Sequence, residues 1–179
     1  MLEITVPVYP IEKSVLSRLL EAKNIRVNEY AGVYMDHSGF RTEGPREQVA
    51  VVLCSLRELG LAGGAVFAEI FSRASELGLF PCRPWMGLYL RLAYTGQPRS
   101  RNGLLSGAHC SPDGAVTVLS EFLEKDGAFP KGLYLRNVDG VLWLRGYVCG
   151  EDYRWLPEDV FALEKKRPFS IHVDECPVS

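Results

Sequence analysis

Residues 133–148 read LYLRNVDGVLWLRGYV, and this stretch decides the fold. Its centre, Asp139-Gly140, is typical of a two-residue hairpin turn, because both positions of such a turn take left-handed backbone angles. On either side of the turn, leucines alternate with aromatic or basic residues, which is the period of a β-strand. The sequence therefore predicts a hairpin of strands Leu133–Arg136 and Val141–Val148, with the leucines facing a core.

Helical spacing of apolar residues occurs in the first half of the chain. It predicts an amphipathic helix over residues 11–23 and a second, clearer one over residues 64–77 that ends at Gly78. Residues 1–9 are short, apolar and interrupted by Pro7, which favours an edge strand or arm. Further β-like stretches are expected at residues 25–35, 48–56, 88–93, 104–110, 115–119 and 160–163, with one more in the tail at 169–179.

Helices that precede a cluster of strands favour the α+β class over alternating βαβ units. We predict a single domain over residues 1–179, with a mainly antiparallel sheet and two amphipathic helices on one face. Within it, residues 1–47 form an N-terminal strand and helix segment, residues 48–167 the core, and residues 168–179 a C-terminal tail.

Composition narrows the classes of function. The formal net charge is −2, which gives no general attraction to nucleic acid or to an anionic membrane. The longest apolar run, residues 49–54, is far shorter than the roughly 20 residues of a membrane-spanning helix. The N-terminus lacks a signal-peptide pattern, and the 5 cysteines have no disulfide-framework spacing. We expect reduced thiols, a cytoplasmic location and no membrane partner.

Three segments carry an aromatic residue and an arginine two positions apart, so that both side chains share one face of a strand. If the strands belong to one sheet, these side chains lie together on the face opposite the leucines. Such a face can stack planar or anionic ligands and pair with carboxylates or phosphates. The alternative is purely structural, since cross-strand pairs of this kind stabilise any half-exposed sheet by ~0.2–1 kcal/mol. The residues are Tyr89 and Arg91; Tyr134 and Arg136; and Trp143, Arg145 and Tyr147.

Catalytic and metal-binding patterns are weaker. A cysteine nucleophile would have to use Cys82 or Cys110 with His109 or His37, and nothing in their spacing supports it. Zinc sites usually contain pairs such as C-x₂-C, which are absent from the sequence. The closest candidates for metal ligands are the neighbours His109 and Cys110, and the pair His172 and Cys176.

Anion-binding patterns are also incomplete. The turn at residues 60–64 runs from a strand into a helix, but it lacks the Lys-Ser/Thr pair of a phosphate loop. Residues 81–112 contain four arginines and no acidic residue, which indicates either an anion-binding patch or a solvated loop. These arginines are Arg83, Arg91, Arg99 and Arg101.

A further set of motifs is informative through its order along the chain. The motifs are Glu58-Leu59-Gly60-Leu61, Glu69-Ile70, Arg73-Ala74, Glu76-Leu77-Gly78-Leu79 with Cys82, Leu90-Arg91-Leu92-Ala93-Tyr94 with Gln97-Pro98, Leu142-Trp143-Leu144, and Trp155 with Pro157-Glu158-Asp159 and Phe161. In this order, over residues 48 to about 165, the chain resembles a family of short, uncharacterised bacterial proteins. The resemblance implies a common fold and a bacterial source, and it carries no catalytic residue. The chain departs from the family at residues 82–85 and 109–110.

These patterns favour a non-catalytic binding or interaction module that needs no cofactor and recognises a protein or a small anionic or aromatic ligand. On this hypothesis, Arg91→Ala or Trp143→Ala abolishes binding of the partner and leaves the fold intact. One alternative is a small cysteine- or metal-dependent hydrolase or transferase. Another is a protein that binds single-stranded nucleic acid, which the net charge disfavours and whose affinity would fall steeply with salt.

Overall fold

The hairpin at residues 133–148 forms as the sequence predicts. In the computed structural model, which describes residues 1–42, 45–100 and 111–165, β6 (Gly132–Val138) pairs antiparallel with β7 (Val141–Tyr147). Val138 lies opposite Val141, so Asp139 and Gly140 form the turn, and both have positive φ angles. The alternation along both strands is therefore fixed by the turn.

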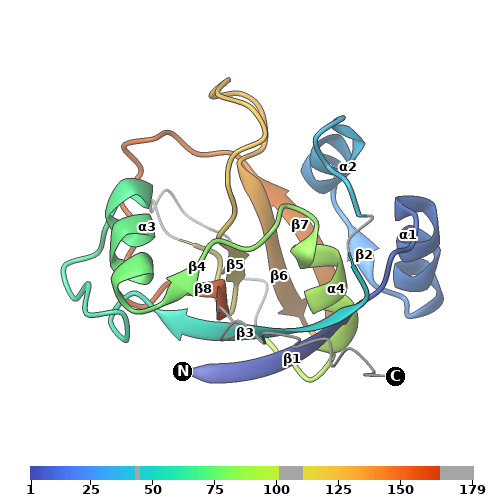
Figure 1. The fold of residues 1–179 in the computed structure, drawn as a ribbon, viewed down its shortest axis with the longest axis horizontal. Coiled ribbons are helices and arrows are strands. Elements are labelled where there is room, and N and C mark those ends of the chain that lie inside the picture. The colour runs from blue at the N-terminus through green and yellow to red at the C-terminus, as the bar shows by residue number, and fades with distance from the viewer. Residues whose placement is uncertain (43–44, 101–110, 166–179) are drawn as a thin grey trace, which may run out of the picture.

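Eight strands of the described residues form one curled, mixed sheet in the order β1-β3-β8-β5-β6-β7-β2, and β4 pairs with β8 (Figure 1). Two of the pairs, β2 with β7 and β5 with β8, are parallel, so the expectation of a mainly antiparallel sheet is not confirmed. Parallel pairs join segments that are distant in sequence and have no turn to signal them. The remaining strands are β1 (Leu2–Val8), β2 (Arg26–Val27), β3 (Glu47–Ser55), β4 (Leu79–Phe80), β5 (Val116–Val118) and β8 (Val160–Lys165).

The strands expected at 1–9, 48–56, 115–119 and 160–163 correspond to β1, β3, β5 and β8, and β1 lies at an edge of the sheet as predicted. Of the segment predicted as β-like at 25–35, only Arg26–Val27 is strand. The segments at 104–110 and 169–179 lie outside the described residues.

Four helices occur in the described residues, and the chain is a single α+β domain, as expected. The predicted helices at 11–23 and 64–77 are confirmed as α1 (Lys13–Ala22) and α3 (Phe67–Glu76). The predictions of β structure over most of 25–35 and over 88–93 are wrong, because α2 (Glu29–Asp36) and α4 (Met86–Ala93) form there. Residues 86–91 of α4 are all buried, so the helix has no polar stripe to reveal its period.

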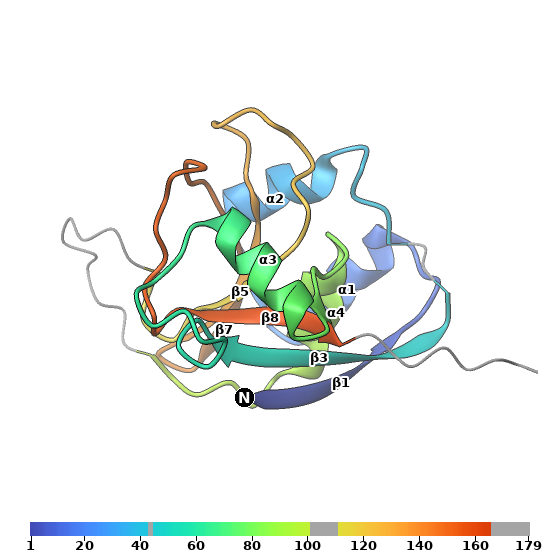
Figure 2. The ribbon, with the colours of Figure 1, turned by 60° about the vertical axis from the view of Figure 1, so that its left-hand side comes forward.

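The core has two parts, one on each face of the sheet. Along β3, Val51 and Leu53 pack with α1, α2 and α4, whereas Val52 and Cys54 pack with α3. Figure 2 shows α3 lying over β8 and β3, apart from α1. The expected arrangement of two helices on one face is therefore not confirmed, since β3 is covered by helices on both faces.

The start of α2 is held against β7 by the side chain of Asn28, the N-cap residue. Its Oδ1 accepts hydrogen bonds from the N–H groups of Ala31 (3.0 Å) and Gly146 (2.8 Å), and its Nδ2 donates to the carbonyl oxygen of Gly146 at 3.3 Å. Gly146 permits this approach because a Cβ at that position would lie 2.5 Å from the carbonyl carbon of Tyr30. We call these interactions the Asn28–Gly146 contact.

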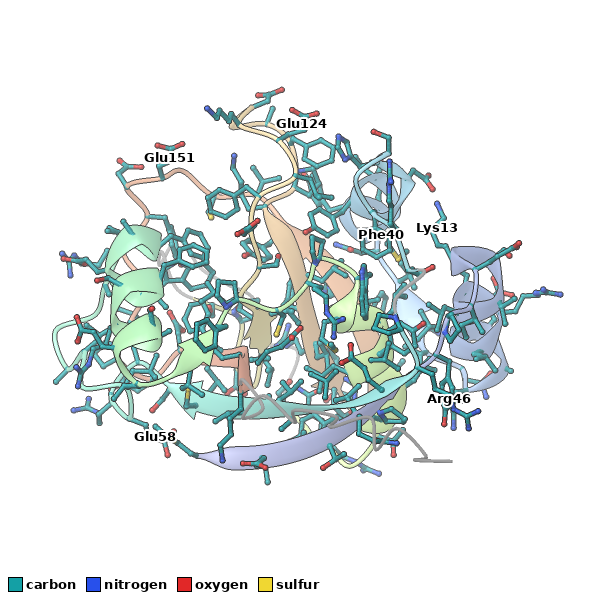
Figure 3. All side chains as sticks on the ribbon, viewed as in Figure 1. Lys13, Phe40, Arg46, Glu58, Glu124 and Glu151 are labelled. Carbon is teal, nitrogen blue, oxygen red and sulfur yellow. The ribbon has the colours of Figure 1, made fainter. Side chains whose placement is uncertain are left out.

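The other end of α2 is held from both sides, as the positions of Lys13 and Glu124 in Figure 3 show. Lys13 Nζ donates to the carbonyl oxygen of Met35 at 2.9 Å and pairs with Asp36 at 2.8 Å. His37 Nε2 lies 2.9 Å from a carboxylate oxygen of Glu124. With the Asn28–Gly146 contact, these bonds fix α2 at both of its ends.

Replacing Gly146 by alanine is expected to lower the free energy of unfolding by about 1–3 kcal/mol, because the added methyl group would collide with the backbone of α2. Gly32, inside α2, is the matched control: a Cβ there meets nothing within 4 Å. Gly32→Ala should raise the free energy of unfolding by up to about 1 kcal/mol, since alanine favours helix. Urea denaturation followed by circular dichroism measures both, and a Gly146→Ala protein as stable as the wild type would contradict the contact.

Candidate functional site

The side chains of the two hairpin strands divide between the two faces of the sheet, as their alternation in the sequence predicts. Leu133, Leu135 and Leu144 lie in the core shared with α4. The opposite face carries five of the seven predicted site residues, with Tyr134 opposite Arg145 and Arg136 opposite Trp143 in the register. The fifth, Tyr147, lies opposite Gly132.

The remaining predicted site residues, Tyr89 and Arg91, do not lie on this face. They belong to α4, which packs on the leucine face, so their assignment to a strand face is wrong. Tyr89 is buried, and its hydroxyl donates a hydrogen bond to the carbonyl oxygen of Tyr9.

Arg91 is completely buried and makes hydrogen bonds to neutral groups. Its guanidinium donates to Gln97 Oε1 at 2.5 Å and to the carbonyl oxygen of Tyr94. Gln97 in turn donates to the carbonyl oxygen of Leu135 at 3.2 Å, which links α4 to β6. Burial lowers the pKa of Arg91 to about 10, so the group remains a cation at neutral pH. Arg91 therefore has the structural role that the sequence left open.

Arg136 also has a structural role. It is 4% exposed, and its Nε donates to the carbonyl oxygen of Asp113 at 2.9 Å and lies 3.3 Å from Ser100 Oγ. These bonds tie β6 to the segments at 100 and 113. Trp143 stacks with Arg26 of β2, whose guanidinium carbon is 5.6 Å from the ring centre.

A cavity of about 470 Å³ opens beside the hairpin, and the other three predicted residues line it. It lies where the ends of β5, β6 and β7 meet the start of α2 and the loop before β8. Five of its lining residues are aromatic, and it is the size of an ordinary small-ligand site. The lining residues are Asn28, Tyr30, Ser111, Pro112, Ala115, Thr117, Tyr134, Arg145, Gly146, Tyr147, Val148, Cys149, Tyr153 and Trp155.

Arg145 is the one charged side chain among these lining residues. Its guanidinium carbon lies 5.1 Å from the ring centre of Trp143 and 5.9 Å from that of Tyr134. No carboxylate of the described residues forms an ion pair with it, and its Nε has no hydrogen-bond partner there. Arg145 therefore brings an uncompensated positive charge to the cavity.

Trp155 anchors the aromatic wall of the cavity. Its ring makes edge-to-face contacts with Tyr147 at 5.8 Å and with Tyr153 at 4.8 Å between ring centres. It is 4% exposed, and its indole Nε1 has no hydrogen-bond partner in the described residues. A buried donor without an acceptor costs about 1–3 kcal/mol of folding free energy.

The hydroxyl groups and the thiol at the cavity are held in their neutral forms. Burial raises the pKa of the Tyr134 hydroxyl, and it raises the pKa of the Tyr147 hydroxyl well above its usual value. Burial likewise raises the pKa of the Cys149 thiol to about 11. None of these groups is an anion at neutral pH.

The proposed cysteine nucleophiles find no support in the described residues. Burial raises the pKa of Cys82 well above its usual value, and His37 bonds to Glu124 and to the Gly39 N–H. Across residues 1–42, 45–100 and 111–165, no group of three His, Cys, Asp or Glu side chains could hold a metal ion. The other candidates lie outside these ranges: His109, Cys110, His172 and Cys176.

The glycine turn and part of the arginine segment are occupied by the chain itself, whereas Arg99 is exposed and forms no ion pair within the described residues. Glu69 places a carboxylate 2.9 Å from the Val66 N–H at the start of α3, where a phosphate would bind. Arg83 pairs with Glu47 at 2.6 Å and with Glu164 at 3.5 Å. Arg101 lies outside the described residues.

Within the described part of the chain, no helix is long and apolar enough to cross a membrane.

The sequence predicts only three of the fourteen residues that line the cavity, Tyr134, Arg145 and Tyr147. Asn28 carried a usable signal, because Asn followed by Glu is a common start of a helix, but the segment was interpreted as β-like. Thr117 lies between two valines of β5, so the alternation places its side chain on the opposite face from theirs. Nothing in the sequence shows, however, that Thr117 lies opposite Tyr134. Tyr153 and Trp155 come from an irregular loop and carry no periodic signal.

Replacing Arg91 by alanine is expected to lower the free energy of unfolding by about 2–4 kcal/mol, because buried acceptors on Gln97 and Tyr94 lose their donor. Arg18, on the exposed side of α1, is the control, and Arg18→Ala should change stability by less than about 0.5 kcal/mol. Denaturation curves measure both changes. Equal stability of the two variants would contradict the structural role of Arg91 and leave the predicted binding role open.

The thiol of Cys149 should react slowly with iodoacetamide at pH 7.5. A pKa of about 11 in place of 9.0 reduces the thiolate fraction roughly a hundredfold. Labelling followed by peptide mapping measures the rate for Cys149, and also for Cys54 and Cys82. The control is the same protein unfolded in urea. If Cys149 of the native protein reacts as fast as Cys149 of the unfolded chain, the nucleophile hypothesis would be supported instead.

Comparison of the chain with protein-family models, with curated proteins and with solved structures finds no match. The resemblance to a family of short bacterial proteins therefore stays an expectation, as do the bacterial source and the cytoplasmic location. The site must be interpreted from its own geometry.

Proposed function

We propose that the protein is a non-catalytic binding module that takes a small ligand with a flat ring system into the cavity beside the hairpin. The observation that carries this proposal is the convergence of five aromatic residues and one arginine without an ion-pair partner on a single cavity of about 470 Å³. Four of the aromatic residues come from β6, β7 and the loop before β8, and the fifth comes from α2, which is distant from them in sequence.

The cavity is largely formed before any ligand binds. Edge-to-face contacts fix Trp155 against Tyr147 and Tyr153, and the Asn28–Gly146 contact fixes the wall formed by α2. A flat ring entering this space can make further edge-to-face or offset contacts with the walls. Rigid walls reduce the entropy that binding must overcome, which favours affinity.

The chemistry of the lining supports binding rather than catalysis. The lining residues within the described part of the chain include no Asp, Glu or His, so none of these is suited to general acid–base work near neutral pH. The one thiol there, Cys149, is protonated because burial raises its pKa to about 11. A reaction would need a group that neither the hydroxyls nor the guanidinium supplies.

The test uses N-phenyl-1-naphthylamine, an uncharged dye whose fluorescence rises on entering an apolar site. The wild-type protein should bind it saturably with one site per chain. Cys149→Phe, which places a ring in the cavity, should weaken binding at least about tenfold. Val33→Phe adds the same ring on an exposed position of α2 that does not line the cavity, and it should leave binding unchanged.

Circular dichroism melting curves establish that both variants are folded. No saturable binding by the wild type would overturn the proposal, and so would a folded Cys149→Phe protein that binds the dye as tightly as the wild type.

A further inference from the structure

We infer that the natural ligand of this cavity carries a single negative charge, held as a planar carboxylate by Arg145. The inference rests on the proposed function, because it names the charge class of the molecule that the cavity binds. It is drawn from the charges around the cavity and from the fact that Arg145 forms no ion pair within the described residues.

The described residues bring a charge of +1 to the cavity, because Arg145 is the one charged residue among those that line it. A ligand with one negative charge neutralises it, whereas a dianion would leave an excess negative charge among aromatic rings, where charge is poorly solvated. An uncharged ligand would leave the guanidinium without a counter-ion. A monoanion is therefore the charge class that matches the cavity.

Neighbouring cations are already engaged elsewhere. Lys131 is 2% exposed, and its Nζ donates to the carbonyl oxygen of Asp126 at 2.9 Å and lies 3.4 Å from that of Glu124. Arg136 donates to the carbonyl oxygen of Asp113. Neither cation lines the cavity, so a second negative charge on the ligand would have no cation of its own among residues 1–42, 45–100 and 111–165.

The first turn of α2 does not supply a dianion site either. Asn28 and Tyr30 bring this turn to the cavity, but the Ala31 N–H already donates to Asn28 Oδ1 at 3.0 Å. Glu29 adds a carboxylate to the same turn, which opposes a second negative charge.

The donor geometry favours a carboxylate. A guanidinium presents a planar fork that matches the two oxygens of a carboxylate, and stacking on Trp143 and Tyr134 limits the orientations that the fork can take. A ring bearing a carboxylate can lie among the tyrosines while its charged end meets Arg145.

The experiment compares three ligands with one ring system by isothermal titration calorimetry at pH 8. They are 2-naphthoate, the uncharged 2-naphthamide, and 2-naphthyl phosphate, which is a dianion at this pH because the second pKa of a phosphate monoester is about 6. We expect 2-naphthoate to bind roughly ten- to a hundredfold more tightly than either of the others, the factor that a charge-assisted hydrogen bond contributes.

Two variants locate the source of this preference. Arg145→Met removes the charge and keeps the apolar stem of the side chain. It should reduce the affinity for 2-naphthoate to the level of the affinity for 2-naphthamide. The affinity for 2-naphthamide should stay within about threefold of the wild-type value. Arg26→Met is the matched control, because Arg26 also stacks on Trp143 but does not line the cavity. It should leave the affinity for 2-naphthoate unchanged.

The possible failures are distinguishable. If none of the three ligands binds the wild-type protein, the proposed function fails, and the charge inference fails with it. If 2-naphthamide binds as tightly as 2-naphthoate, or the phosphate binds most tightly, the charge inference is overturned while the ring-binding cavity stands. A preference for 2-naphthoate that survives Arg145→Met would overturn the role of Arg145.

Discussion

The Asn28–Gly146 contact is the interaction on which the shape of the cavity depends. One side-chain amide satisfies both backbone groups of Gly146 and caps the first turn of α2 through Ala31. The missing side chain of Gly146 lets the helix backbone approach the strand directly. Tyr30 is thereby held in the same cavity lining as Arg145 and Tyr147. The hairpin alone could not form this wall of the cavity.

Three arginines with the same sequence signature have three different environments. Arg91 is buried and donates hydrogen bonds to neutral acceptors such as Gln97 Oε1. Arg136 donates a hydrogen bond from the hairpin to the backbone of a distant segment, at Asp113. Arg145 alone of these three lines the cavity, and it has no ion-pair partner among the described residues. The cost of desolvating a guanidinium is offset for Arg91 and Arg136 by hydrogen bonds within the fold. For Arg145, the lack of an ion-pair partner among the described residues favours an anion from outside.

Local signals in the sequence were sufficient for the elements that have one polar and one apolar face. The hairpin, α1 and α3 were predicted because their periods are visible within ten to twenty residues. The helix α4 was missed because its burial removes the polar stripe, although Met86–Ala93 contains no β-branched residue and consists mostly of good helix formers. The cavity could be predicted only in part, since its walls depend on contacts such as that between Asn28 and Gly146, which are 118 residues apart.

The most direct measurement is a crystal structure of the protein grown with 2-naphthoate. Binding as inferred places the carboxylate about 2.7–2.9 Å from the Arg145 guanidinium, with the naphthalene ring against Tyr134, Tyr147 and Trp155. A structure in which 2-naphthoate lies elsewhere on the surface, with the cavity beside the hairpin filled by side chains of the protein itself, would contradict the assignment of this cavity as the binding site.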